Sequence, residues 1–130
     1  MKSKFIIALT IVAAVGIIAY GAKYLSSIKR YKTIVKNIEI SDVDLSQMKN
    51  GKYHGQCDAE VISAEVEVTV DNNKIEKIEL LNHKNERGKK AESIIDDVVK
   101  EQKITVDTVS GATNSSKVIL KAIENALEQK

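Results

Sequence analysis

The sequence predicts an α+β fold. A small, mostly antiparallel sheet carries two amphipathic helices packed on it, and one N-terminal transmembrane or signal-anchor helix precedes it. Three observations predict this. Residues 5–22 carry no charge, residues 61–70 alternate between apolar and polar side chains, and apolar stripes with helical spacing run through residues 91–99 and 118–127. These patterns are typical of a membrane span, a half-buried strand and helices packed on a core.

The N-terminal apolar run is long enough to cross a bilayer. Its 18 residues, Phe5 to Ala22, would span about 27 Å as a helix, close to the thickness of the hydrocarbon core. Lys2 and Lys4 form a positive segment before it. A cleaved signal peptide is the alternative, with Ala19-Tyr20-Gly21 as a small-x-small site. We favour an uncleaved anchor over residues 1–22, because the run is long for the apolar region of a signal peptide and no helix-breaking polar c-region follows it.

A basic tether, partly with helical spacing, is expected over residues 23–48, before a domain over residues 49–130. The charge excess that follows the apolar run would place the domain in the cytoplasm by the positive-inside rule. This basic flank suits a membrane surface. The rest of the chain has more acidic than basic residues, which argues against nucleic acid as a partner. The basic residues that follow the apolar run and precede the acidic part are Lys23, Lys29, Arg30, Lys32 and Lys36.

Three strands are predicted in the first half of the domain. Residues 49–55 form a turn that enters a short strand. In residues 61–70, acidic side chains alternate with valines, which indicates a strand with one buried face. Residues 71–74 form a turn, since Asn and Asp tolerate a left-handed backbone and hydrogen-bond locally. Residues 75–81 return as the second strand of an antiparallel hairpin.

The second half of the domain combines two helices with one more strand. Residues 83–90 are polar and are predicted to form a loop. Residues 91–99 form a helix, residues 104–109 a short strand, and residues 118–127 a helix near the C-terminus. The resulting order, β-β-β-α-β-α, is typical of a small α+β domain with its helices on one face of the sheet.

The stretch Asp107–Ser116 is the strongest candidate for a functional site. A helix N-terminus offers unpaired N–H groups and the positive end of the helix dipole, and it therefore suits a phosphate. Gly111 allows the backbone to approach an anion closely. The alternative is that Asn114 or Ser115 only caps the helix while Gly111 ends a strand. Hydroxyl donors are supplied by Thr113, Ser115 and Ser116.

Nucleophilic catalysis is not indicated by this stretch. The hydroxyls of Ser110 and Thr113 would need an adjacent base, and the two histidines, His54 and His83, are remote in sequence. We therefore predict no catalytic residue. The single cysteine, Cys57, excludes an internal disulfide and a multi-cysteine metal site, and we predict no metal ligand.

The residues Asp107-x-x-Ser110-Gly111-Ala112-Thr113 resemble the D-x-x-S/T-G-A-T flavinylation motif of FMN-binding domains. That family includes the flavinylated C and G subunits of the sodium-translocating NADH:quinone oxidoreductase and of Rnf complexes, and many small exported flavoproteins. The resemblance extends over about residues 49–128. It includes Gly51-Lys52-Tyr53-x-Gly55, the valine-rich hairpin and His83-x-x-Glu86-x-Gly88.

The resemblance implies a covalently bound cofactor. In the family, a separate magnesium-dependent FAD:protein FMN transferase joins FMN to the final threonine of the motif by a phosphoester bond. Thr113 would be that residue here. Asp107, Ser110, Gly111 and Ala112 would be read by the transferase or shape the turn. The other expected cofactor-binding residues are Ser115 and Ser116 at the helix start, Tyr53 and His83 as neighbours of the isoalloxazine ring, and Glu86 as a hydrogen-bond partner.

We therefore expect a membrane-anchored, extracytoplasmic flavoprotein. It would relay electrons between redox partner proteins, or from quinone-linked donors, as a carrier or subunit rather than a stand-alone enzyme. The positive-inside rule favours a cytoplasmic domain. We still expect the domain outside the cytoplasm, because covalent attachment would keep the FMN from being lost outside the cell. Two alternatives stay open. One is a flavin-dependent reductase component acting on a terminal acceptor, and the other is a non-redox anchored module that binds phosphorylated ligands or a partner protein.

Overall fold

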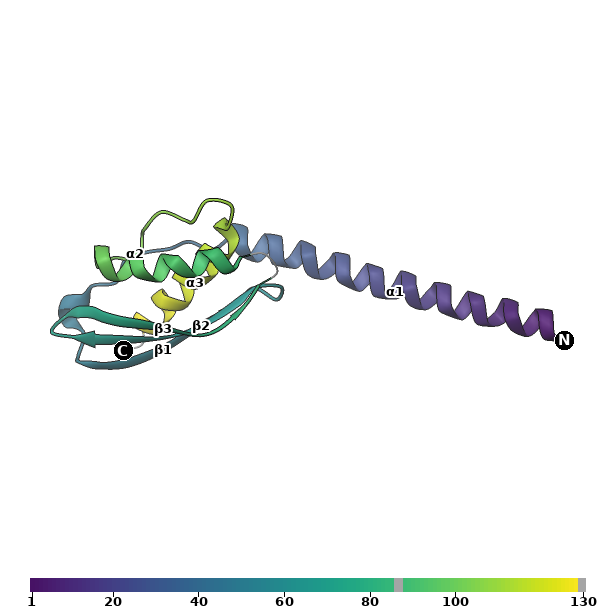
Figure 1. Cartoon of the computed structure of the whole chain (residues 1–130), viewed down its shortest axis with the longest axis horizontal. Coiled ribbons are helices and arrows are strands. Elements are labelled where there is room, and N and C mark those ends of the chain that lie inside the picture. Colours follow the sequence, from purple (N-terminus) through teal and green to yellow (C-terminus); the bar gives the residue numbers. More distant parts are fainter. Residues whose placement is uncertain (86–87, 129–130) are drawn as a thin grey trace.

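The computed structural model describes residues 1–85 and 88–128. A three-stranded sheet and two helices form a two-layer domain, and a third, much longer helix projects from one end of it (Figure 1). The elements in chain order are α1 (Lys2–Lys36), η1 (Leu45–Gln47), β1 (Gly51–Asp58), β2 (Ser63–Asp71), β3 (Lys74–Lys84), η2 (Lys89–Ser93), α2 (Ile94–Glu101) and α3 (Thr113–Leu127).

The sheet has the order β1-β2-β3, and both pairings are antiparallel, as the sequence predicts. The hairpin between β2 and β3 closes on Asn72 and Asn73, with φ angles of 50° and 60°. Two consecutive left-handed residues are typical of a type I′ turn, whose twist matches that of the flanking strands. In β2, buried and partly exposed residues alternate, with Ala64, Val66 and Val68 facing the core.

Both predicted amphipathic helices lie on one face of the sheet (Figure 1). The first begins as the 3-10 turn η2 and continues as α2, whose Ile94 and Val98 are fully buried. The second, α3, begins at Thr113, earlier than the apolar stripe from residue 118 indicates. Its apolar residues make the centre of the core against β1 and β2.

The strand predicted over residues 104–109 is wrong, because this described segment forms no strand and does not pair with the sheet, and the N–H of Val106 donates to the nearby carbonyl of Ile104 at 2.8 Å. Its alternation reflects one-sided burial of Ile104 and Val106. The donors that a neighbouring strand would satisfy are taken by a side chain. The Asp42 carboxylate accepts the N–H groups of Ile104 and Thr105 at 2.8 and 2.9 Å, and the Thr105 hydroxyl at 2.8 Å.

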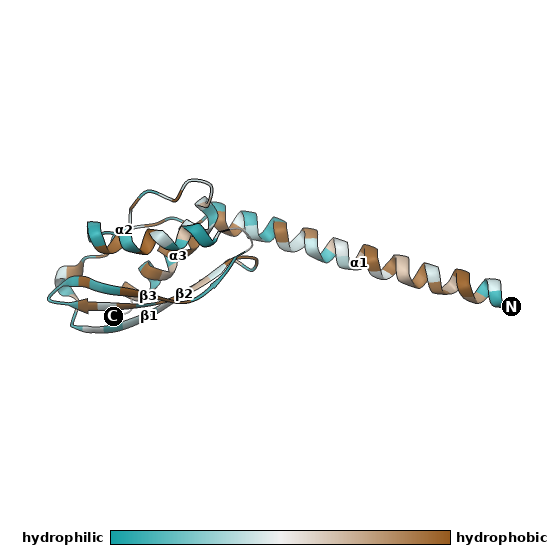
Figure 2. Cartoon of the chain, viewed as in Figure 1, coloured by the Kyte–Doolittle hydropathy of each residue, from teal (hydrophilic) through white to brown (hydrophobic). Residues whose placement is uncertain are grey.

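Helix α1 is long and apolar enough to cross a membrane. Over its apolar part, which Figure 2 shows in brown, the side chains are not buried in the protein, and the most apolar 18-residue window has a mean hydropathy of 2.4. A signal sequence near an N-terminus has the same properties. The helix continues without a break through Lys36, into the segment expected to be a tether.

The chain between α1 and β1 lies against the domain. Val35, near the end of α1, is buried in the core. The buried Glu124 of α3 accepts the N–H of Ser41 at 3.2 Å, and Lys121 donates to the carbonyl of Glu39 at 3.2 Å. These bonds fix the end of α1 relative to α3.

The Asp42→Asn variant tests the side-chain bridge to residues 104–105. Hydrogen bonds from Thr105 and Ile104 hold the pKa of Asp42 below its usual value. The ionised form therefore stabilises the fold at neutral pH, and this contribution is lost as the pH falls through the lowered pKa. Near pH 6, we expect the variant to lower the free energy of unfolding by about 1 kcal/mol. The effect is small because the carboxylate is exposed and screened by solvent.

Urea denaturation of the full chain in detergent, near pH 6 and near pH 3, measures this difference. It should shrink at the lower pH, because Asp42 of the parent then becomes protonated. Glu39→Gln is the matched control, in the same segment and exposed. An equal loss of stability in the control, or a difference independent of pH, would contradict the assignment.

Candidate functional site

The residues before α3 form a tight turn that requires glycine. The N–H of Ala112 donates to the carbonyl of Val109 at 2.9 Å, and Gly111 has a φ of 76°. A left-handed third residue is typical of a type II turn, where glycine is favoured because it lacks a Cβ. The motif glycine is therefore set by backbone geometry.

A buried hydroxyl locks this turn to the helix. The Oγ of Ser116 donates to the carbonyl of Ala112 at 2.8 Å and accepts the N–H of Val109 at 3.0 Å. Ser116 is fully buried, its bond to the carbonyl of Ala112 is buried, and its bond from the N–H of Val109 is partly buried. Ser116 therefore holds the turn. The sequence pattern alone could not distinguish this structural role from direct contact with the cofactor.

The turn leaves Thr113 exposed as the first residue of α3. The capping alternative is not what the structure shows. The N-cap position is Ala112 rather than Asn114 or Ser115, and no side chain of the described residues caps the helix. The N–H groups of the first turn thus remain without a side-chain acceptor.

A cavity of about 370 Å³ opens beside Thr113. Its size lies within the range of small-molecule sites. One side is formed by the helix start and the turn, and the other by apolar and aromatic side chains from α1 and the β1–β2 loop. The lining residues are Tyr31, Val61, Ile62, Gly88, Gly111, Ala112, Thr113, Asn114 and Ser115.

The buried hydroxyl of Ser115 lacks a partner. Its Oγ has no hydrogen bond within residues 1–85 and 88–128, although the residue is only 2% exposed. Gly88 lies against it so closely that a Cβ there would come 1.9 Å from the Oγ. Buried polar groups are nearly always satisfied, so an orphan on the wall of a cavity fits a polar ligand.

A sequence profile of the FMN-binding domain family matches residues 62–128, from the end of the β1–β2 loop to the end of α3. The chain belongs to the FMN-binding domain family. It is therefore a flavin-binding protein, and the family resemblance read from the sequence is confirmed. A search of curated proteins found no match.

The cavity of this FMN-binding domain fits the cofactor at both ends. FMN joins a dianionic phosphate to a flat, largely apolar ring. The helix start and the orphan Ser115 hydroxyl suit the phosphate and ribityl end, whereas Tyr31, Val61 and Ile62 suit the ring.

Lys90 adds a cation to the phosphate end. A Cβ on Gly111 would come 2.5 Å from the Lys90 Nζ, which places the ammonium directly over the turn. Lys90 was not among the residues predicted for the site. The sequence shows a pair of lysines, Lys89 and Lys90, after Gly88, but two adjacent charges in a polar loop usually point only into solvent.

His83 does not line the cavity, but it contacts Asn85, whose side chain accepts the N–H of Gly88 on the cavity wall. It pairs with Ala64 across the sheet, and its side chain is only 2% exposed. Its Nδ1 lies 3.1 Å from Glu92 Oε1, while its Nε2 has no hydrogen-bond partner in the described part of the chain. The predicted partner Glu86 lies outside the described residues.

Tyr53 and Asp107 are not brought to the cavity. Tyr53 lies near the start of β1, donates its hydroxyl to the carbonyl of Lys49 at 2.6 Å, and lines a different cavity with Leu127 and Glu128. These residues mark the C-terminal end of α3, about 22 Å from Thr113 for a helix of 15 residues. Asp107 is exposed ahead of the turn, where another protein can contact it.

The ring side of the cavity was also missed. Tyr31, Val61 and Ile62 belong to α1 and to the β1–β2 loop, both distant in sequence from Thr113. Tyr31 and Val35 are four residues apart and therefore share one face of a helix. That spacing does not predict which part of the domain this face packs against.

Two serine variants separate the turn from the ligand. In the protein without bound flavin, Ser116→Ala should lower the free energy of unfolding by about 1–2 kcal/mol, because it leaves the partly buried N–H of Val109 without an acceptor. Ser115→Ala should be neutral or slightly stabilising, because it removes a buried hydroxyl that has no partner in the described residues.

Urea denaturation of the full chain, produced without a transferase and held in detergent, measures both effects. The two serines are adjacent in α3 and equally buried, so each serves as the control for the other. A loss in Ser115→Ala that matches Ser116→Ala would show that the Ser115 hydroxyl is satisfied within the protein.

Proposed function

We propose that this chain carries FMN covalently on Thr113 and relays electrons between redox partners. The observation that carries the proposal is the placement of Thr113. Its hydroxyl-bearing side chain is exposed at the first position of α3, directly after the glycine turn and on the rim of the cavity. Membership of the FMN-binding domain family supplies the cofactor.

The surroundings of Thr113 suit a phosphodiester. The helix dipole favours a negative charge at this end by about 1 kcal/mol at most for an exposed group. The N–H groups of the first turn point toward an anion there. The Lys90 ammonium over Gly111 adds a neutralising charge.

An external enzyme has to make the bond, since the described residues place no general base beside Thr113. In the proposed step the Thr113 oxygen forms a bond to the phosphorus of the FMN half of FAD. The pyrophosphate bond of FAD breaks, AMP leaves, and the threonine proton is lost to a base of the FAD:protein FMN transferase. Asp107 and Ser110 are exposed in the segment that leads into Thr113, as residues read by that transferase would be.

The bound flavin would supply the redox chemistry, and the protein would supply attachment, orientation and charge. Helix α1 would anchor the chain in the membrane as a single span. We place the domain outside the cytoplasm, where a covalent bond prevents loss of the cofactor. This placement goes against the basic residues that follow the apolar run.

Attachment is tested by coexpressing the chain with an FMN transferase. Thr113→Ala should abolish in-gel flavin fluorescence after denaturation, and the FMN mass should be found on the Thr113 peptide of the parent chain. Thr108→Ala is the matched control, since it removes an exposed hydroxyl from the same motif without touching the acceptor. A parent chain that stays colourless, or fluorescence that survives Thr113→Ala, would refute the covalent assignment.

Carrier function predicts that the flavinylated chain alone does not sustain turnover between a physiological donor and acceptor. Stopped-flow measurements should show the flavin bleached once by a chemical reductant and reoxidised once by an acceptor. Steady turnover of a physiological donor and acceptor without any partner protein would instead identify a flavin-dependent reductase.

A further inference from the structure

The candidate flavin cavity lies at the end of the domain where α1 joins it. The start of α3, the loop after β1 and the end of β3 all meet at this end, whereas the β2–β3 turn and the end of α3 lie at the opposite end (Figure 1). Of the lining residues, Tyr31 alone comes from α1. It follows Ala22, the last residue of the apolar run, by nine helical positions, about 14 Å along the axis.

Tyr31 is held between two environments. It is partly buried and packs against the core, while it also faces the cavity beside Val61 and Ile62. Tyr24, two turns earlier on the same helix, is 50% exposed. The difference marks Tyr31 as the aromatic residue of α1 that the domain has taken up.

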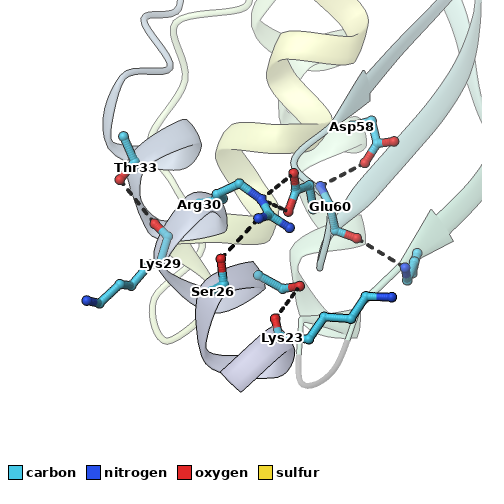
Figure 3. Close-up of polar contacts among 9 residues, drawn as sticks. Lys23, Ser26, Lys29, Arg30, Thr33, Asp58 and Glu60 are labelled. Carbon is cyan, nitrogen blue, oxygen red and sulfur yellow. Dashed lines mark hydrogen bonds and ion pairs between the residues drawn. The ribbon is translucent and has the colours of Figure 1, made fainter. Parts of the chain in front are cut away.

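An ion pair ties α1 to the loop that carries Val61 and Ile62. The Arg30 Nε lies 3.0 Å from both carboxylate oxygens of Glu60, and the Arg30 guanidinium also donates to Ser26 Oγ at 3.1 Å (Figure 3). Lys29, the next residue on α1, points away from Glu60 in the same view. We refer to Arg30 and Glu60 as the helix clamp.

Glu60 is held in an unfavourable conformation. Its φ is 69°, in the left-handed region that is uncommon for glutamate and strains the backbone. The Asp58 carboxylate accepts its N–H at 2.8 Å, and Lys84 donates to its carbonyl at 3.1 Å. The loop thus holds a strained residue in place by three separate interactions, one of which reaches α1.

The cavity has a polar end and an apolar end, which would set the orientation of a bound flavin. The helix start, with Thr113 and Ser115, lines one end, and Tyr31, Val61 and Ile62 line the other. The Lys90 ammonium lies over Gly111 at the turn. A cofactor fixed by its phosphate at Thr113 would extend its ring toward the second end. Flat aromatic rings pack favourably on one another, so Tyr31 is the natural wall for an isoalloxazine.

We propose that Tyr31 forms the aromatic wall of the flavin-ring site and that the helix clamp positions it, so that the membrane-proximal helix is a structural part of the cofactor site. This inference rests on the proposed attachment of FMN to Thr113. It holds whether or not the apolar run is removed at residues 19–21, because Arg30 and Tyr31 lie beyond that point.

The test uses the full chain, flavinylated by coexpression with the transferase and held in detergent. A tyrosine stacked on a flavin quenches its fluorescence by electron transfer. Tyr31→Ala should therefore raise the fluorescence per covalent flavin several-fold, whereas Tyr24→Ala, the matched control on the same helix, should leave it unchanged. Flavin content, measured by absorbance after denaturation, should equal that of the parent.

The clamp is tested by charge reversal. Arg30→Glu should raise the fluorescence partway toward the Tyr31→Ala value, the double variant Arg30→Glu with Glu60→Arg should lower it again, and Lys29→Glu should have no effect. Normal flavin content with unchanged fluorescence in Tyr31→Ala would overturn the Tyr31 assignment alone. Absence of covalent flavin from the parent chain would instead overturn the proposed function.

Discussion

The Ser116 hydroxyl makes the pair of hydrogen bonds on which the site depends. By joining the N–H of Val109 to the carbonyl of Ala112, it fixes the turn against the first residues of α3. The left-handed Gly111 completes that turn, and Thr113 then starts the helix with its side chain exposed. A buried serine and a glycine without a Cβ thus place one threonine at the positive end of a helix, which is the environment that a phosphoester needs.

Around this turn, the cavity is assembled from parts of the chain that are distant in sequence. The hydroxyl end comes from α3, and the apolar end comes from α1 and the β1–β2 loop. A cation from η2, Lys90, lies over Gly111 at the turn. Only long-range packing can bring these parts together. The bonds from Ser41 to Glu124 and from Lys121 to Glu39 attach the end of α1 to α3, so they also fix the relation between the two ends of the cavity.

Side chains replace backbone pairing where the sheet ends. Residues 104–109 alternate like a strand, yet the carboxylate of Asp42 takes their first two N–H groups. A local pattern shows which side of a segment is buried, but it does not show whether the partner of its backbone is a strand or a side chain. The same limit applies to Tyr53. Its place near a family motif suggested a ring contact, whereas the direction of β1 carries it to the far end of α3.

The sequence alone determined the antiparallel hairpin, the two amphipathic helices, the long apolar N-terminal helix and the family. Each of these can be predicted from a local periodicity or from a contiguous motif. Thr113 could be identified because the helix start, the glycine and the hydroxyl residues are neighbours in the chain. Tertiary structure alone decided that Ser116 holds the turn, that the Ser115 hydroxyl lacks a partner among the described residues, that Lys90 lies over Gly111, and that Tyr31 lines the cavity. Those facts depend on which buried surfaces pack together over long separations, and a one-dimensional pattern does not record that.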